Sequence, residues 1–159
     1  MTNLRRGMMA AGSSITPLWY RFYITAPASR IETQEINFVV NSVSQPTANM
    51  TDYNAPSPYI TSSSTQDAGL TWYAFSTDEG DWGSANTQPP HWIRIYLGDY
   101  EVPITLSSYT YQASYSASRC PTAWVLTQSS TGDFSGEETT VDTQSGLSWS
   151  AAETKTFNL

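Results

Sequence analysis

Seven side chains in or beside the predicted loops have the chemistry that a sugar-binding site requires. In water, a glycan is recognised by an aromatic ring that covers its apolar face and by a few planar or charged groups that hydrogen-bond its hydroxyls. Arg119 is the strongest candidate, because a guanidinium offers a rigid fork of donors. The alternative for Arg119 is a structural ion pair with Asp78 or Asp81. The candidate ligand-binding residues are Trp72, Tyr73, Asp78, Asp81, His91, Tyr115 and Arg119.

The large aromatic candidates and the histidine also have a structural interpretation. Trp72 and Tyr115 could be rim residues that cover the core rather than contacts to a ligand or partner. His91 begins a predicted strand, so a hydrogen-bonded histidine at the edge of that strand is the alternative to a ligand contact. The sequence leaves both interpretations open.

Catalysis is not predicted. Two pairs of nearby carboxylates could be considered for glycoside hydrolysis, Asp78 with Asp81 and Glu137 with Glu138. That reaction requires two carboxyl groups about 5–5.5 or 6.5–9.5 Å apart across a cleft, whereas adjacent acidic residues on a turn usually form a solvated surface. A single cysteine, Cys120, excludes an intrachain disulfide and a multi-cysteine zinc site, and it is predicted to be inert. We therefore predict a protein that is not an enzyme.

Short segments rich in β-branched and aromatic residues, separated by Ser, Thr, Asn, Gly and Pro, predict an all-β sandwich or barrel. In one of them Ile93, Ile95 and Leu97 alternate with aromatic and charged residues, so the period of two directs these aliphatic side chains into the core. Ser42–Pro58 and Thr77–Pro90 are predicted to be long loops. The predicted strands are Trp19–Thr25, Glu35–Asn41, Tyr59–Ser62, His91–Leu97, Ile104–Gln112, Ala123–Ser129, Glu138–Asp142 and Lys155–Leu159.

Composition and charge narrow the classes of partner. The chain has 159 residues, enough for one domain, and its 39% hydrophobic and 13% aromatic content excludes a disordered chain. The net charge is −7, with 7 Lys and Arg. A nucleic-acid partner is not expected, because binding a polyanion requires clustered cations. Membrane insertion is not expected either, because no long apolar run is present.

The first 18 residues are predicted to form an N-terminal arm in front of a domain at residues 19–159. The arm carries two of the seven cations of an otherwise acidic chain. The apolar stretch behind them is shorter than the roughly 7–15 residues that an export signal requires. The arm would suit docking to a partner subunit, ordering as it binds; the alternative is a disordered terminus. The candidate docking residues are Leu4, Arg5, Arg6, Met8 and Met9.

Four stretches in order along residues 60–159 carry a family pattern. They are Ala74-Phe75 followed by Asp81-Trp82-Gly83-Ser84, then PHWIRIYLG at 90–98, RCPTAWVLTQSSTG at 119–132, and VDTQSG at 141–146 leading to Phe157. Together they resemble motifs of the discoidin-like, coagulation-factor type C family. The pair of strands that usually closes such a domain is similar to Tyr20–Thr25 and Gln34–Phe38 at the front, so the chain resembles a circularly permuted member, an arrangement that neighbouring termini tolerate.

The resemblance implies an eight-stranded antiparallel jelly-roll β-sandwich that performs no chemistry and binds glycans, lipid head groups or proteins with loops at one end. The loops Thr71–Trp82 and Tyr111–Arg119 would flank that end. Framework positions of the family correspond to three tryptophans, Trp82, Trp92 and Trp124, which are expected in core or loop-anchoring roles. Relatives often hold a structural calcium ion; here Ser76 replaces one acidic ligand, although Asp78 and Asp81 follow closely. No other cofactor is implied.

Permuted forms with this Ser- and Thr-rich, aromatic composition are similar to tail and other virion proteins of bacteriophages. The resemblance therefore implies a virion structural protein, assembled in the host cytoplasm in many copies and associated with the tail, baseplate or tail fibre. It would contact other virion subunits through the arm and a host-surface glycan through the sandwich, weakly in each copy but with avidity from many. The alternatives are a purely structural decoration or cement protein of the capsid or tail and a free bacterial carbohydrate-binding module.

Overall fold

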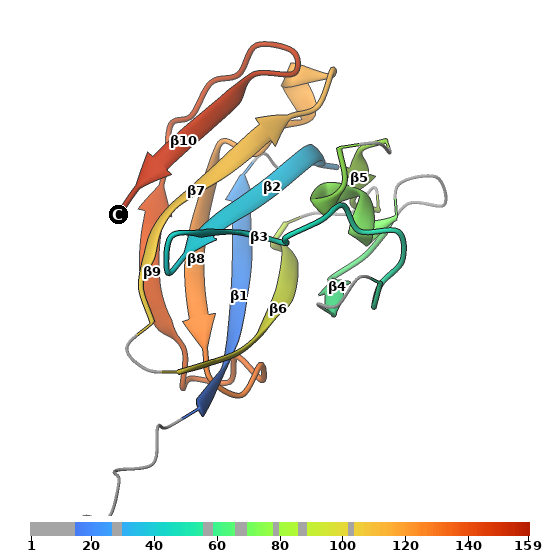
Figure 1. Ribbon diagram of the computed structural model, residues 1–159. Helices are drawn as coiled ribbons and strands as arrows, with labels where there is room; N and C mark the ends of the chain where they lie inside the picture. Colours follow the sequence, from blue (N-terminus) through green and yellow to red (C-terminus); the bar gives the residue numbers. More distant parts are fainter. Residues whose placement is uncertain are drawn as a thin grey trace, which may run out of the picture.

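Two antiparallel β-sheets pack face to face as a β-sandwich (Figure 1). One sheet has the order β4-β6-β1-β8-β9; the other has the order β10-β7-β2-β3, with β5 paired to the start of β2. The computed structural model describes residues 15–26, 30–55, 59–65, 70–77, 80–85, 89–101 and 104–159. The strands are β1 (Ile15–Ala26), β2 (Glu32–Val40), β3 (Val43–Gln45), β4 (Ile60–Ser62), β5 (Trp82–Gly83), β6 (His91–Glu101), β7 (Leu106–Ala113), β8 (Ala123–Ser129), β9 (Thr139–Gln144) and β10 (Thr154–Asn158).

The predicted all-β class is confirmed, and each of the predicted strands overlaps a strand of the structure. The number of strands differs from the expected eight, because the described residues contain ten. The two extra strands, β3 and β5, lie within segments predicted as loops and have three and two residues. Alternation cannot be recognised over such short lengths. Two short 3₁₀-helices, η1 (Thr71–Phe75) and η2 (Ala117–Arg119), were also not predicted.

The alternation predicted for β6 is confirmed. Ile93, Ile95 and Leu97 are buried, whereas the residues between them are half-buried on the outer face of the five-stranded sheet that contains β1. Because successive side chains of a strand point to opposite faces, β6 supplies aliphatic side chains to the core and aromatic and charged ones to the outside.

Aromatic rings from the two sheets meet in the core. Tyr20 of β1 stacks on Phe38 of β2, with ring centroids 5.0 Å apart, and Tyr111 of β7 stacks on Trp124 of β8 at the same distance. Trp82 and Trp124 are buried, as expected for framework tryptophans, whereas the third, Trp92, is half-buried on the outer face of its sheet. Burying each such side chain contributes about 1.5–3 kcal/mol, so aromatic packing between the sheets stabilises the sandwich without a disulfide.

The two ends of the sandwich are distinct. β1 begins at one end, and β7 ends and β2 begins at the other (Figure 1). The predicted arm residues Leu4, Arg5, Arg6, Met8 and Met9 lie outside the described residues. Among the described residues, no helix has the length and apolar character needed to cross a membrane. We call the end that contains the start of β2, η1, β5, the end of β7 and η2 the loop end.

Candidate binding site at the loop end

A buried carboxylate organises the loop end. Glu32, at the start of β2, has a side chain only 8% exposed. Its Oε1 accepts hydrogen bonds from the guanidinium groups of Arg30 and, at 2.8 Å, Arg119. Its Oε2 accepts one from the hydroxyl of Ser114 at 3.2 Å. Buried charges are stable only when paired and hydrogen-bonded, so Glu32 fixes two arginines and the turn after β7 relative to the core.

Arg119 does form an ion pair, as its structural alternative predicted, but its partner in the structure is Glu32. Glu32, rather than Asp81, faces its guanidinium, and Asp78 lies outside the described residues. Arg119 donates to Glu32 through one nitrogen, Nη1, and its side chain remains 49% exposed. The rest of the guanidinium fork therefore faces solvent from a fixed position.

Tyr115 lies next to Ser114, on a turn whose backbone is fixed by hydrogen bonds. The Ser114 hydroxyl accepts the backbone N–H of Ser116 at 3.0 Å, and the Ser116 carbonyl accepts the N–H of Arg119 at 2.8 Å. Between the two serines, Tyr115 is 72% exposed, the largest exposure among the large hydrophobic side chains of the described residues. The ring thus faces solvent while the backbone on both sides of it is held in place.

The structure brings Asp81 to the same end and places Tyr73 partly against the core. Burial, together with the nearby negative charges of Asp81 and Glu32, raises the pKa of the Cys120 thiol to about 11. Cys120 is therefore a protonated, buried thiol near the carboxylates. The Tyr73 ring is fixed by an edge contact to Trp72, with centroids 4.4 Å apart.

Two of the seven candidates lie in the interior. Trp72, in η1, is 9% exposed and belongs to the core cluster, so it covers the core as the structural alternative proposed. His91 is 1% exposed at the start of β6, where it pairs with Ile24 of β1. Side chains with so little exposed surface offer almost none to a ligand. The loop end is therefore built from Tyr73, Asp81, Tyr115 and Arg119 rather than from all of the predicted residues.

The calcium site predicted near Asp78 and Asp81 falls only partly within the described residues. Asp78 lies outside them, and no three His, Cys, Asp or Glu side chains among them gather as ligands for a metal ion. A structural calcium ion needs six to eight oxygen ligands, and the described carboxylate of Asp81 supplies few of them. We assign no role to calcium.

Sequence reasoning missed Arg30, Glu32 and Ser114, on which the geometry of the loop end depends. A signal for two of them existed, because Arg30 and Glu32 are two residues apart and therefore lie on one face of an extended chain. The signal went unused because β2 was predicted to begin at Glu35, three residues too late.

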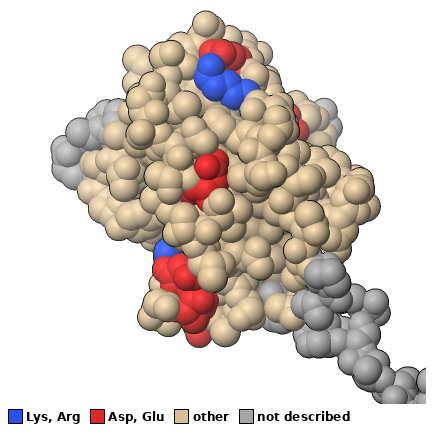
Figure 2. Space-filling model, turned by 90° about the vertical axis from the view of Figure 1, so that its left-hand side faces the viewer, with Lys and Arg blue, Asp and Glu red and all other residues tan. Residues whose placement is uncertain are grey.

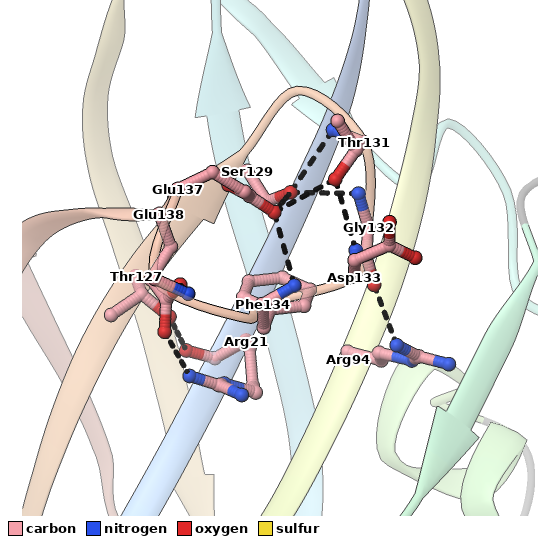
Figure 3. Close-up of polar contacts among 11 residues, drawn as sticks. Arg21, Arg94, Thr127, Ser129, Thr131, Gly132, Asp133, Phe134, Glu137 and Glu138 are labelled. Carbon is pink, nitrogen blue, oxygen red and sulfur yellow. Dashed lines mark hydrogen bonds and ion pairs between the residues drawn. The ribbon is translucent and has the colours of Figure 1, made fainter.

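The segment 130–138, which we call the strap, partly covers the outer face of the sheet that contains β1 (Figure 3). The Ser129 hydroxyl accepts the N–H groups of Thr131 and Gly132, at 3.1 and 2.7 Å, and donates to Glu137 Oε1 at 2.7 Å. The same Glu137 oxygen accepts the N–H of Phe134 at 3.0 Å. These hydrogen bonds, first that of Ser129, lower the pKa of Glu137 below its ordinary value. The strap is thus held by its own polar contacts.

Two arginines attach the strap to the sheet. Arg21 and Arg94 are directly opposite each other on β1 and β6, an arrangement that like charges disfavour. Arg21 forms an ion pair with Glu138 at 2.9 Å and lies 4.4 Å from the centre of the Phe134 ring. Arg94 donates to the carbonyl of Gly132 at 2.6 Å. Each guanidinium therefore has separate partners in the strap (Figure 3), and we assign this face a structural role.

Replacing Gly132 by alanine is expected to lower the free energy of unfolding by about 2–5 kcal/mol, the sum of about 1–2 kcal/mol for a non-glycine residue at positive φ and about 1–3 kcal/mol for overpacking against Trp19. Gly132 has φ +82°, and a Cβ there would lie 2.7 Å from the nearest atom of the Trp19 indole. Gly146→Ala is the matched control, because Gly146 has φ +66° and no atom within 4 Å of its Cβ position. Urea denaturation of both variants measures the difference due to Trp19; equal losses would contradict close packing of the strap.

The surface of the molecule carries few charges. On the face shown in Figure 2, acidic and basic side chains gather in small patches on an otherwise uncharged surface. Among the described residues of the loop end, Arg30 and Arg119 both pair with Glu32, and Asp81 is a second carboxylate near Cys120, so two cations balance two anions. Such a site is suited to ligands recognised by hydrogen bonds and ring contacts rather than by net charge.

No protein-family model, curated protein or solved structure matches the chain. The discoidin-like resemblance therefore rests on the four sequence stretches, and the structure adds an antiparallel β-sandwich.

Proposed function

We propose that the loop end binds glycans and that the protein is a non-enzymatic adhesion module. The observation that carries the proposal is the juxtaposition, on one pinned turn, of the exposed ring of Tyr115 and the guanidinium of Arg119, which buried Glu32 holds in place. The ring can cover the apolar face of a sugar, and the free part of the guanidinium can donate to its hydroxyls. Because the Arg119 guanidinium and the backbone of the turn that carries Tyr115 are held before a ligand arrives, less conformational freedom is lost on binding.

We further propose that this module is a jelly-roll sandwich of the discoidin type in a bacteriophage virion, associated with the tail, baseplate or tail fibre. The four motif stretches and their permuted order support this setting. The position of the ends supports it too, because β1 begins at the end of the sandwich opposite to the loop end (Figure 1). An arm docked into a neighbouring subunit would leave the loop end facing outward, and many copies would turn weak contacts into avidity.

A glycan array tests the proposal with the protein multimerised on a tetrameric carrier. We expect wild-type protein to bind at least one class of glycan, and Tyr115→Ala to reduce that signal about tenfold or more, since a well-placed ring contributes of the order of a tenfold change in affinity. Thermal unfolding should leave Tyr115→Ala as stable as wild type, because its side chain is exposed.

Val43→Ala is the control, since Val43 is a 49% exposed apolar residue on β3, away from the loop end. Its array signal should equal that of wild type. No glycan above background for the multimerised wild type would contradict the proposal and favour the alternative of a structural decoration protein. A Tyr115→Ala variant that binds as well as wild type would place the sugar elsewhere.

A further inference from the structure

A groove runs along the edge of β4, in the sheet that contains β1, and reaches η1 at Thr71. Its volume is about 310 Å³, at the lower limit of the roughly 300–1,000 Å³ range of small-molecule sites. Two tyrosines, Tyr53 and Tyr59, and several hydroxyl side chains, including Thr61 and Thr65, line it. Within the described residues, no charged side chain lines this groove.

The edge of β4 contributes backbone groups to the groove. The Tyr59 carbonyl accepts the N–H of Tyr96, and the Ser63 N–H donates to the Trp92 carbonyl, both at 2.8 Å. In an antiparallel ladder the residues between such pairs direct their N–H and C=O groups away from the partner strand. The backbone groups of Ile60 and Ser62 therefore point toward the groove.

Part of this edge is already used within the chain. The Ile60 N–H donates to the Tyr53 carbonyl at 3.1 Å. The Ile60 carbonyl and both backbone groups of Ser62 remain directed at the groove. An added peptide strand needs a continuous row of edge groups, and the segment at Tyr53 interrupts that row. The groove therefore favours a compact ligand over an extended peptide.

Two residues that line the groove, Tyr59 and Thr61, are held by contacts with side chains on the outer face of the sheet. The Tyr59 ring meets the Trp19 ring edge-on, with centroids 6.2 Å apart and planes at 78°, while remaining 41% exposed. The Thr61 hydroxyl accepts a hydrogen bond from Arg94 Nε at 2.8 Å. Because Arg94 can only donate, this contact does not use the hydroxyl's own proton, which can be donated to a ligand.

We propose that this groove binds one neutral pyranose residue of a glycan. The ring of Tyr59 would cover the apolar face of the sugar, while the Thr61 hydroxyl and the Ser62 backbone groups would hydrogen-bond its hydroxyls. A neutral sugar is favoured over a uronic or sialic acid, because none of the described residues that line the groove is a cation that could pair with a carboxylate. The inference stands independently of the proposed loop-end site, since none of Tyr73, Asp81, Tyr115 and Arg119 lines the groove.

The test is an NMR titration of isotope-labelled full-length protein with the methyl glycosides of glucose, galactose, mannose and N-acetylglucosamine. We expect at least one of them to shift the amide resonances of Ser62 and its neighbours. Tyr59→Ala should weaken this binding about tenfold, and Thr65→Val about threefold or more through the loss of one hydroxyl. Thr65→Val keeps the test valid if Tyr59→Ala fails to fold, because Thr65 is exposed. Tyr115→Ala should leave the Ser62 shifts unchanged.

Three results would overturn the inference. One is that no glycoside shifts the Ser62 resonance; if shifts then occur only around Tyr115, the loop-end function survives without this second site. Another is that both Tyr59→Ala and Thr65→Val bind as wild type does. The third is a response of Ser62 to a short extended peptide but to no glycoside, which would assign the groove to strand addition.

Discussion

Replacing Glu32 by alanine is expected to lower the free energy of unfolding by about 2–4 kcal/mol, because three donors lose the acceptor that holds them. The donors belong to Arg30, Arg119 and Ser114, and the carboxylate between them is 8% exposed. Arg30 and Arg119 can turn toward water in the variant, which limits the loss. The change is measured by urea denaturation at neutral pH.

The same substitution should weaken glycan binding, since Arg119 would no longer be held beside Tyr115. Glu153→Ala is the control, because Glu153 forms a more exposed ion pair with Lys155, with side chains 33% and 29% exposed. Such a pair contributes about 1 kcal/mol or less. Equal destabilisation by both substitutions would show that the buried carboxylate does not organise the loop end.

Replacing Tyr109 by phenylalanine is expected to cost about 2–3 kcal/mol, although only one oxygen is removed. The Tyr109 hydroxyl of β7 donates to Asp142 Oδ2 of β9 at 2.5 Å and accepts the indole N–H of Trp124 of β8 at 3.0 Å. It therefore joins the two sheets by hydrogen bonds, and the variant leaves a buried indole N–H without its acceptor. Urea denaturation measures the cost.

The pH dependence of stability provides a second measurement of this hydroxyl. Burial, followed by the hydrogen bond to Asp142, raises the pKa of Tyr109 above its ordinary value of 10.0. Above about pH 10 the unfolded chain loses the phenolic proton while the folded protein keeps it, so the unfolded state binds fewer protons and stability falls as the pH rises. The loss should be smaller in Tyr109→Phe; buried Tyr111, whose pKa is also raised, accounts for part of what remains.

Tyr115→Phe is the control for the loss of a phenolic hydroxyl. Tyr115 is 72% exposed, so its variant should unfold within about 0.5 kcal/mol of wild type. If Tyr109→Phe were as stable as Tyr115→Phe at neutral pH, the hydroxyl of Tyr109 would not join the sheets.

The strands were predictable because burial on one face leaves a period of two in the sequence. In β6, Ile93, Ile95 and Leu97 show that period, and the structure buries all three. The hairpin between β2 and β3 was not predictable in this way. Its turn places Asn41 and Ser42 at φ 49° and 66°, as in a type I′ turn, but Asn-Ser is a weaker signal for it than Asn-Gly.

The site was predicted only in part, because its geometry depends on contacts that are distant in sequence. Tyr115 and Arg119 were found from their residue types, but Arg119 is 87 residues from its partner Glu32. Trp72 has the same residue type as a ligand-binding aromatic, and only the folding of η1 against the core shows that it is buried. The groove beside β4 was not found, because backbone edge groups leave no mark in the sequence.

The most direct test of glycan binding at the loop end is a crystal structure of the protein soaked with the glycan that gives the strongest array signal. The account predicts a sugar ring stacked on Tyr115, with a hydroxyl within hydrogen-bond distance of the Arg119 guanidinium and with Glu32 still holding that arginine. A sugar bound elsewhere, with Tyr115 left in solvent, would contradict it.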